Sequence, residues 1–327
     1  MSATVSPPQP SQTQPAPTGA HWGEPSQWQW EGHSIHWRVL GQRDAPALVL
    51  LHGFGAASGH WRHNASALVE AGWCVYAIDL LGFGASSQPP HRRHRPLDNR
   101  LWARQLQAFL EQVVQAPAVL VGNSLGGLVG ITCAVFFPNW VLAVIAAPLP
   151  DPTLLLPIQR RRARWGRVLR RPLVVLLCRL LPLELLLPLI VRSPLLDLGL
   201  RSAYSDQSAV DLELRRLVAR PALRPTAARA LRAMSIGMAL RPGPATAPCL
   251  LRRLKHPLLV LWGSQDRLIP IEVSQQLRQH KEDLELQQLH GVGHCPHDEH
   301  PELFNAAVLS WLTRNLVVGP PREQPWA

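Results

Sequence analysis

One short stretch, residues 119–127 with the sequence V-L-V-G-N-S-L-G-G, constrains the fold more than any other part of the chain. Residues 118–121 form an apolar run that predicts a strand, and residues 125–137 have helical spacing, so Ser124 falls at the turn between them. A glycine stands two residues before the serine and another two residues after it. A sharp strand-to-helix turn crowds these two positions, and residues without a Cβ fit there best. The stretch therefore predicts a serine hydroxyl raised above the edge of a sheet.

The position of Ser124 suits a nucleophile, although the pattern alone is short. A serine at the start of a helix lies where free N–H groups and the helix dipole favour developing negative charge. The alternative is an ordinary strand, turn and helix without catalytic meaning. The residues upstream and downstream must decide between the two interpretations.

A second loop is predicted to border the same serine. Residues 47–51 are continuously apolar, which is typical of a strand covered on both faces in a parallel sheet. The strand ends in His52-Gly53-Phe54-Gly55, where glycine lets the backbone approach a ligand. We expect the backbone N–H groups of Phe54 and Leu125 to form an oxyanion hole, because two such donors stabilise the charge that acyl transfer creates. The alternative is a tight turn with His52 as a packing residue.

Two aspartates follow predicted strands, and only one is predicted to be catalytic. Asp79 ends the apolar strand 74–78 and precedes a glycine turn, so we expect it to tie down that turn. The turn lacks the third glycine of a dinucleotide fingerprint, which implies no nucleotide. Asp266 follows the apolar strand 257–262, and its loop can carry it toward the serine. We assign Asp266 as the catalytic acid; the alternative is a turn aspartate only.

The candidate base lies in a histidine-rich segment near the end of the chain. A strand over residues 284–289 leads into H-G-V-G-H-C-P-H, and a loop between two glycines lets His294 reach over the sheet edge. Four histidines and a cysteine lie between His290 and His300, so a metal site is an alternative. Their spacing matches no recognised zinc pattern. The segment therefore predicts His294 as the base, with no metal and no cofactor.

The composition changes abruptly in the middle of the chain. Residues 148–254 are rich in Leu, Arg and Pro, as in short helices broken by proline, and we interpret them as an inserted helical cap. The N-terminal residues are rich in Pro, Ser, Gln and Thr, with no secretory pattern, and are expected to be disordered. The predicted organisation is a disordered tail (1–27), an α/β core (28–147 and 255–318), the cap (148–254) and a loose C-terminal tail (319–327).

The cap contains an apolar segment that is nearly long enough to span a membrane. Residues 172–191 are interrupted by Arg179, Glu184 and two prolines, which disfavours a spanning helix and favours an apolar lid. Just before it, residues 160–171 form a basic stretch with a tryptophan, which suits peripheral contact with anionic lipid. The alternative is a solvated helix face.

The overall charge admits the same two interpretations. The chain of 327 residues has 33 Lys and Arg against 22 Asp and Glu, a formal charge of +11. This suits an anionic membrane surface, while a compositional bias toward Arg, Pro, Ala and Leu would explain it without function. No nucleic-acid partner is expected. The five cysteines are odd in number and scattered, which favours a reducing, cytoplasmic location.

Taken together, these motifs identify a family resemblance. The order Ser124, Asp266, His294 and the motifs H-G-F-G, G-N-S-L-G-G, G-S-Q-D and G-V-G-H resemble the α/β-hydrolase family over about residues 28–316. The resemblance implies a mostly parallel sheet flanked by helices, with an inserted helical cap. It also implies that His294 takes the Ser124 proton, that Asp266 holds the imidazole, and that water resolves an acyl-enzyme. A serine nucleophile argues against epoxide hydrolases and haloalkane dehalogenases, which use a carboxylate.

Two subgroups look closest. The run G-H-C-P-H-D-E-H-P and the motif D-L-L-G-F-G-A-S are similar to pheophytinase and chlorophyll dephytylase-like hydrolases, which remove phytol from chlorophyll pigments. G-N-S-L-G-G also resembles carbon-carbon bond hydrolases that cleave ring-fission products. The apolar cap favours an ester with a long apolar chain, such as a phytyl ester, over a compact acid. A small-ester esterase and a non-catalytic membrane- or ligand-binding protein on the same fold stay open.

Overall fold

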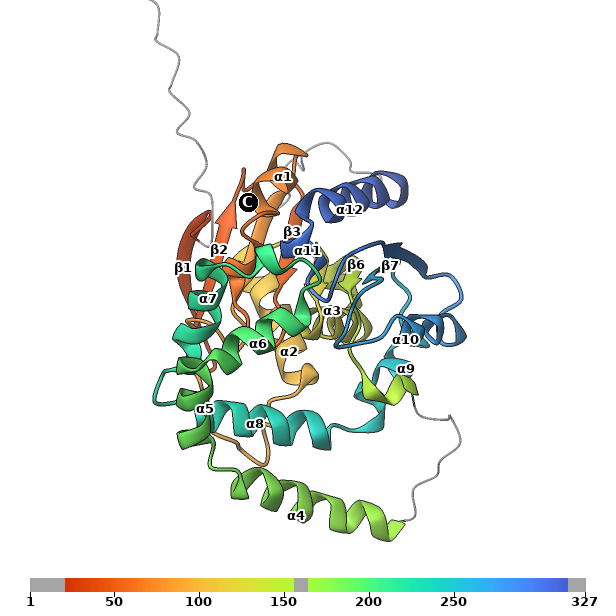
Figure 1. Cartoon of the computed structure of the whole chain (residues 1–327). Helices are drawn as coiled ribbons and strands as arrows, with labels where there is room; N and C mark the ends of the chain where they lie inside the picture. Colours follow the sequence, from red (N-terminus) through yellow and green to blue (C-terminus); the bar gives the residue numbers. More distant parts are fainter. Residues whose placement is uncertain (1–20, 156–163, 317–327) are drawn as a thin grey trace, which may run out of the picture.

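The computed structural model describes residues 21–155 and 164–316, and its core is an eight-stranded sheet (Figure 1). The strand order is β1-β2-β4-β3-β5-β6-β7-β8; the pairs β1-β2 and β2-β4 are antiparallel, and the pairs from β4 to β8 are parallel. The predicted mostly parallel sheet is confirmed. The strands are β1 (Glu24–Trp30), β2 (His33–Leu40), β3 (Ala47–Leu51), β4 (Cys74–Ile78), β5 (Ala118–Asn123), β6 (Val141–Ala147), β7 (Leu258–Gly263) and β8 (Glu285–Leu289).

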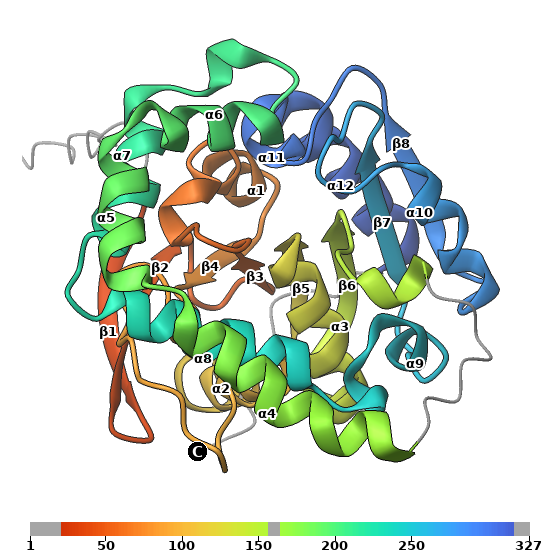
Figure 2. The same ribbon diagram turned by 60° about the horizontal axis from the view of Figure 1, so that its bottom comes forward.

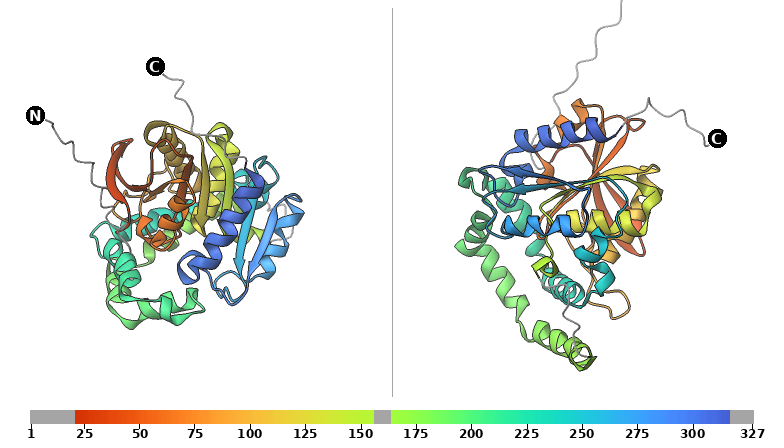
Figure 3. Two further views of the ribbon diagram at one scale, coloured as in Figure 1. Left: turned by 90° about the horizontal axis from the view of Figure 1, so that it is seen from above. Right: turned by 90° about the vertical axis from the view of Figure 1, so that its right-hand side faces the viewer.

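Helices cover both faces of the sheet because its central strands are apolar at nearly every position. Alternate residues of β3 point to opposite faces, so Val49 and Leu51 belong to one core and Leu48 and Leu50 to the other. The first core includes residues of α2 and α3, and the second includes residues of α1 and α12. The layers are visible in Figure 3. These helices and two shorter ones are α1 (Ala65–Glu70), α2 (Asn99–Phe109), α3 (Leu125–Phe136), α10 (Glu272–Gln275), α11 (Pro296–Glu299) and α12 (Pro301–Asn315).

The beginning of the described chain corrects one prediction. Residues 1–20 lie outside the described residues, but residues 21–27 are not a disordered tail. Trp22 is buried, with its indole N–H donating to the carbonyl of Ser58 at 3.2 Å, and β1 begins at Glu24. The polar sequence did not indicate a strand because β1 lies at the edge of the sheet, where it pairs with β2 alone. A strand at the edge of a sheet can contain a proline such as Pro25.

Six α-helices of the described chain lie between β6 and β7. Figure 2 shows them arranged around the ends of the central strands, and the right panel of Figure 3 shows α4 and α5 along the outer edge of the molecule. Helix α4 packs against α8, and α5 packs against α6, α7 and α8. The predicted C-terminal tail from residue 319 lies outside the described residues. The six helices are α4 (Arg164–Leu180), α5 (Leu183–Arg192), α6 (Pro194–Ala203), α7 (Leu212–Ala222), α8 (Ala227–Leu240) and α9 (Ala247–Leu251).

Candidate active site

Ser124 occupies the turn between β5 and α3 in a backbone conformation that few residues adopt. Its φ is 51° and its ψ is −115°, outside the regions favoured by residues with a Cβ. The flanking glycines are required by close contact: a Cβ on Gly122 would clash with the backbone of Gly126, and a Cβ on Gly126 would clash with the carbonyl of Leu51. The steric reason predicted for the two glycines is therefore confirmed.

Asp266 and His294 form a buried hydrogen-bonded pair. The Nδ1 atom of His294 lies 2.8 Å from Oδ2 of Asp266, and their side chains are 9% and 0% exposed. The other carboxylate oxygen of Asp266 accepts from the backbone N–H groups of Leu268 and Ile269, each at 2.9 Å. A neutral imidazole that donates from Nδ1 keeps its lone pair on Nε2, which can then accept a proton. The pair has the arrangement of a base held by an acid.

The residue before the serine connects the serine turn to the loop that contains His294, residues 290–295, which we call the histidine loop. The side-chain amide of Asn123 donates to the carbonyl of Ala147 at 2.7 Å and to the carbonyl of His294 at 3.1 Å. The backbone N–H of Ser124 donates to the same carbonyl of Ala147 at 3.0 Å. The structure thus brings the loop of His294, and with it Asp266, beside Ser124. The sequence assigned no role to Asn123, because an amide in a strand end is not distinctive by itself.

Asp79 has the structural role expected of it. One carboxylate oxygen accepts from the N–H of Ala85 in its own glycine turn at 2.8 Å, and the other accepts from the N–H of Ser58 at 2.6 Å. Burial would raise the pKa of Asp79, but the nearby imidazole of His36, 3.2 Å away, and the backbone donors lower that pKa to about 2. Asp79 is therefore an ionised carboxylate that holds two loops together.

The loop after β3 lies directly against the serine. A Cβ on Gly53 would lie 3.5 Å from Cβ of Ser124. His52 is fully buried; its Nε2 accepts from the N–H of Leu80 at 3.0 Å, so its Nδ1–H donates to the carbonyl of Gly53 at 2.7 Å. Burial lowers the pKa of His52, which is consistent with this neutral form.

The two predicted oxyanion donors belong to the two segments that border the serine. Phe54 follows Gly53 in the loop, and Leu125 is the first residue of α3, where the N–H groups of a helix have no partner within it. The Phe54 side chain is 60% exposed, and its ring centroid lies 5.6 Å from that of Phe83. Stabilisation of an oxyanion by these two N–H groups stays a prediction.

A set of hydrogen bonds that the sequence did not predict joins the cap to the histidine loop. The N–H of His294 donates to the carbonyl of Ala203 at 2.7 Å, at the end of α6. One carboxylate oxygen of Glu299 accepts from the N–H groups of Ser205 and Asp206 at 2.8 and 2.7 Å. Its other oxygen accepts from the N–H of Gly293 at 2.8 Å. We call these residues, Ala203, Ser205, Asp206 and Glu299, the histidine clamp.

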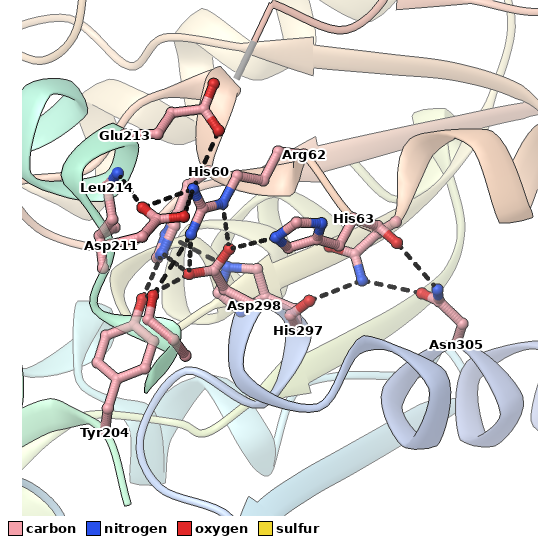
Figure 4. A network of polar contacts seen from close by, with 12 residues as sticks. His60, Arg62, His63, Tyr204, Asp211, Glu213, Leu214, His297, Asp298 and Asn305 are labelled. Atoms are coloured by element: carbon pink, nitrogen blue, oxygen red, sulfur yellow. Dashed lines mark hydrogen bonds and ion pairs between the residues drawn. The ribbon is translucent and has the colours of Figure 1, made fainter. Parts of the chain in front are cut away.

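A buried ionic network anchors the same part of the cap to the core (Figure 4). The side chain of Arg62 is 2% exposed and donates from Nε to Asp298 at 2.8 Å. From Nη1 it donates to Asp211 at 2.7 Å, at the start of α7. The hydroxyl of Tyr204 donates to Asp298 at 2.9 Å. We call Arg62, Tyr204, Asp211 and Asp298 the cap anchor.

The anchor explains the acidic and histidine residues that follow His294. Burial would raise the pKa of Asp298, but hydrogen bonds and charge from His60 and Arg62 hold that pKa well below its usual range. His297 is fully buried, and burial holds its pKa well below 6.5. Its Nε2 lies 3.2 Å from Nδ1 of His60, whose Nε2 lies 2.9 Å from the hydroxyl of Tyr204. Among the described residues no group of three His, Cys, Asp or Glu side chains is arranged to hold a metal ion.

Comparison with known proteins agrees with the fold. The family model for the alpha/beta hydrolase fold matches residues 46–301. A 2-hydroxy-6-oxononadienedioate/2-hydroxy-6-oxononatrienedioate hydrolase of Burkholderia vietnamiensis is 27% identical over 86% of this chain and 91% of its own length. A membrane phospholipase A structure (TM-score 0.68, 24% identity, 90% of this chain and 87% of that chain) is similar in fold.

The structure of a thermophilic esterase from Thermogutta terrifontis is also similar in fold, with a TM-score of 0.66 and 19% identity over 90% of this chain and 100% of the other. None of these three proteins is named as a pigment hydrolase, so the pheophytinase-like resemblance gains no support from them. The match of the family model covers most of the chain. The protein therefore belongs to the α/β hydrolase fold family.

Proposed function

We propose that the protein is a serine hydrolase that cleaves a neutral carboxylic ester with an apolar chain. Ser124 is the nucleophile, His294 the general base and Asp266 the acid that orients it. The observation that carries the proposal is the buried His294–Asp266 pair at 2.8 Å on the loop that Asn123 binds, next to the strained backbone of Ser124. A strained serine beside an oriented imidazole is the arrangement that activates a weak nucleophile.

In the proposed mechanism His294 takes the proton of the Ser124 hydroxyl through Nε2 while Oγ attacks the ester carbonyl. The N–H groups of Phe54 and Leu125 stabilise the oxyanion, and Asp266 remains ionised to stabilise the imidazolium. The imidazolium then gives its proton to the leaving alcohol. Water, deprotonated by His294, attacks the acyl-enzyme and releases the acid and free Ser124.

Three arginines, within the cap or between cap and core, favour a neutral substrate over one with free carboxylates. Arg62 binds Asp298 and Asp211, and Arg241 donates to Asp151 at 2.6 Å. Arg224 donates to the carbonyls of Gly84 and Ser86. Each of these cations already has a partner, while the side chain exposed next to Gly53 is the phenyl ring of Phe54.

A carbon-carbon bond hydrolase is the second candidate, and the relative from Burkholderia vietnamiensis supports it. The same triad could hydrolyse a ring-fission product if the pocket held its carboxylates. A phytyl or other prenyl ester is the finer form of the first candidate. This form needs the cap leucines as a lid over the prenyl chain. Several of these leucines face the solvent instead: Leu173, Leu176 and Leu177 are each 54% exposed.

Substitution and labelling test the triad. Ser124→Ala should abolish hydrolysis of nitrophenyl esters, and a fluorophosphonate should label Ser124. Asp266→Asn should lower kcat by about 10⁴-fold because the imidazole loses its orienting acid. Asp79→Asn is the matched control: it should cost stability and leave kcat of the folded protein nearly unchanged. A label on another residue, or a larger kcat loss for Asp79→Asn, would refute the assignment.

A substrate panel tests the ester class. The panel contains short and long nitrophenyl esters, chlorophyll, pheophytin and a ring-fission dienedioate, with kcat/KM measured for each. We expect kcat/KM to rise with the length of the apolar chain, since each buried methylene contributes about 0.8 kcal/mol. The highest value on the dienedioate would replace the ester by a carbon-carbon bond substrate. Absence of both turnover and label would indicate a binding protein.

A further inference from the structure

The outer helices of the cap present a concentrated apolar surface. Of the 18 large hydrophobic side chains exposed in the described residues, 11 lie between residues 173 and 198. An apolar area of this kind on a folded protein is typical of an interaction site. We call it the leucine face; its members that are at least half exposed are Leu173, Leu176, Leu177, Leu180, Leu181, Leu185, Leu189, Leu195 and Leu198.

The leucine face is not the core side of these helices. On α4 the exposed leucines recur every three or four residues, so they form one stripe along the helix. Val174, Val175 and Cys178 are less exposed than that stripe, and α4 packs against α8. On α5, Val191 is buried while Leu185 and Leu189 are 68% and 65% exposed. The helices are therefore packed through one face and turn a second apolar face to solvent.

The charge around the leucine face is positive. Residues 170–201 contain five arginines and two acids. Both acids are paired with arginines of neighbouring helices, Glu184 with Arg232 at 2.8 Å and Asp197 with Arg215 at 2.9 Å. Of the basic stretch predicted for lipid contact, residues 160–163 lie outside the described residues, and Arg170 and Arg171 are exposed. Arg179, Arg192 and Arg201 are exposed within the segment that contains the leucine face.

The geometry suits helices that lie along a surface. Among the helices in the described part of the chain, none is long and apolar enough to cross a membrane alone. Residues 170–180 and 183–192 together meet the length and composition of a span, but they are bent by 55°. Both helices lie at the outer edge of the molecule (Figure 3), where a flat partner can reach them.

We propose that the leucine face docks on an anionic lipid bilayer. The leucines enter the boundary between headgroups and acyl chains, and the arginines of the same segment bind lipid phosphates, as those of basic amphipathic helices do. A second copy of the chain is a poorer occupant, because a symmetric contact through this face would bring the arginines of both copies together. The proposal does not depend on the reaction at Ser124.

Vesicle binding tests the leucines. The full chain should sediment with vesicles of equal parts phosphatidylcholine and phosphatidylglycerol. The variant Leu177→Ser/Leu180→Ser/Leu185→Ser/Leu189→Ser should bind at least about tenfold more weakly, since it removes most of the inserted apolar surface. The matched control is Leu142→Ser/Leu303→Ser, which replaces leucines that are 38% and 51% exposed outside the cap. We expect the control to bind like the unmodified protein.

A second pair of variants tests the charge. Arg179→Gln/Arg192→Gln should weaken binding to the anionic vesicles and reduce its salt dependence, because exposed charges are screened over about 8 Å at physiological ionic strength. Arg104→Gln/Arg278→Gln removes two exposed arginines elsewhere and should have little effect. Hydrolysis of a short soluble ester is measured for all four variants. We expect unchanged rates, which would show that each variant is folded.

Hydrogen exchange of the unmodified protein provides a readout without substitution. Vesicles should slow amide exchange in α4, α5 and α6, while α12 on the other side of the core should exchange as before. The proposal is overturned if the protein does not bind anionic vesicles, if it binds phosphatidylcholine alone equally well, or if the leucine variant binds normally. It is also overturned if sedimentation velocity shows a dimer that the leucine variant dissociates.

Discussion

The two ends of the cap differ in how they meet the rest of the molecule. The segment from Ala203 to Leu214 is held by the histidine clamp and the cap anchor, whose central charges are buried. The arm formed by α4, α5 and the start of α6 exposes its leucines, and its acid Glu184 is 59% exposed. The same insertion therefore contains one part that is fixed to the loop of His294 and one part that is available to a partner. We expect substitutions to have large effects in the first part and small effects in the second.

The largest difference should appear in stability when the cap anchor is broken. Arg62→Met leaves Asp298, whose side chain is fully buried, without its cation, and removal of one partner of a buried pair costs about 3–5 kcal/mol of unfolding free energy. Urea denaturation measures this loss. Glu184→Gln is the matched control in the arm, because it breaks the pair with Arg232 at a carboxylate that is 59% exposed. Equal losses in the two variants would mean that the anchor is no stronger than a surface contact.

The next effect should appear in catalysis when the histidine clamp is weakened. Glu299→Gln places an amide donor opposite N–H donors of the cap or of Gly293, so the loop of His294 shifts. A displacement of about 1 Å can cost about 100-fold in rate, and we expect such a loss in kcat with little change in KM. Steady-state kinetics on a soluble ester checks this.

If Glu299 positions His294, its substitution lowers the kcat of the folded protein; if Glu299 only stabilises the fold, that kcat is unchanged. The exposed Glu302 of α12 supplies the control Glu302→Gln, which should keep the kcat of the unmodified protein. A Glu299→Gln variant that unfolds more easily but keeps its kcat when folded would assign the clamp to stability alone.

A smaller effect should appear in the pH dependence of stability. The folded pKa of His297 lies well below 6.5 because the ring is buried. Below pH 6.5 the unfolded chain binds a proton at this histidine and the folded chain does not. As the pH is lowered, the free energy of unfolding therefore falls by about 1.4 kcal/mol per pH unit until the folded pKa is reached. His297→Phe keeps the ring contact with Trp61 and should lack this part of the slope. Urea midpoints between about pH 7.5 and 5.5 test it; an unchanged slope would contradict a neutral buried His297.

The smallest effect is expected in the arm. Asp197 and Arg215 form a pair whose side chains are 33% and 38% exposed. Such pairs contribute about 0–1 kcal/mol, so Asp197→Asn should hardly move the urea midpoint. A double-mutant cycle with Arg215→Gln isolates the pair from other changes. A coupling as large as the loss from Arg62→Met would erase the difference between the two ends of the cap.

The sequence by itself determined the features that depend on residues close together along the chain. The turn at Ser124 follows from two glycines at fixed spacing, because only residues without a Cβ fit where the turn meets β3 and its own helix. The apolar runs of β3 and β4 predict buried parallel strands, and Asp79 lies within a few residues of the turn that it holds. Local sterics and short hydrogen bonds are visible in a linear pattern.

Only the tertiary structure decided the features that join distant residues. Arg62 and Asp298 are 236 positions apart, and Tyr204 and Asp298 are 94 apart, so no spacing in the chain could pair them. The leucines of the cap predicted an apolar lid, but which side of each helix meets the core depends on how α4 and α5 pack against α8. Trp22 is buried although it follows a polar tail, because β2 and Ser58 lie next to it in space. Burial is a property of the assembled fold, and composition alone does not assign it to a particular face.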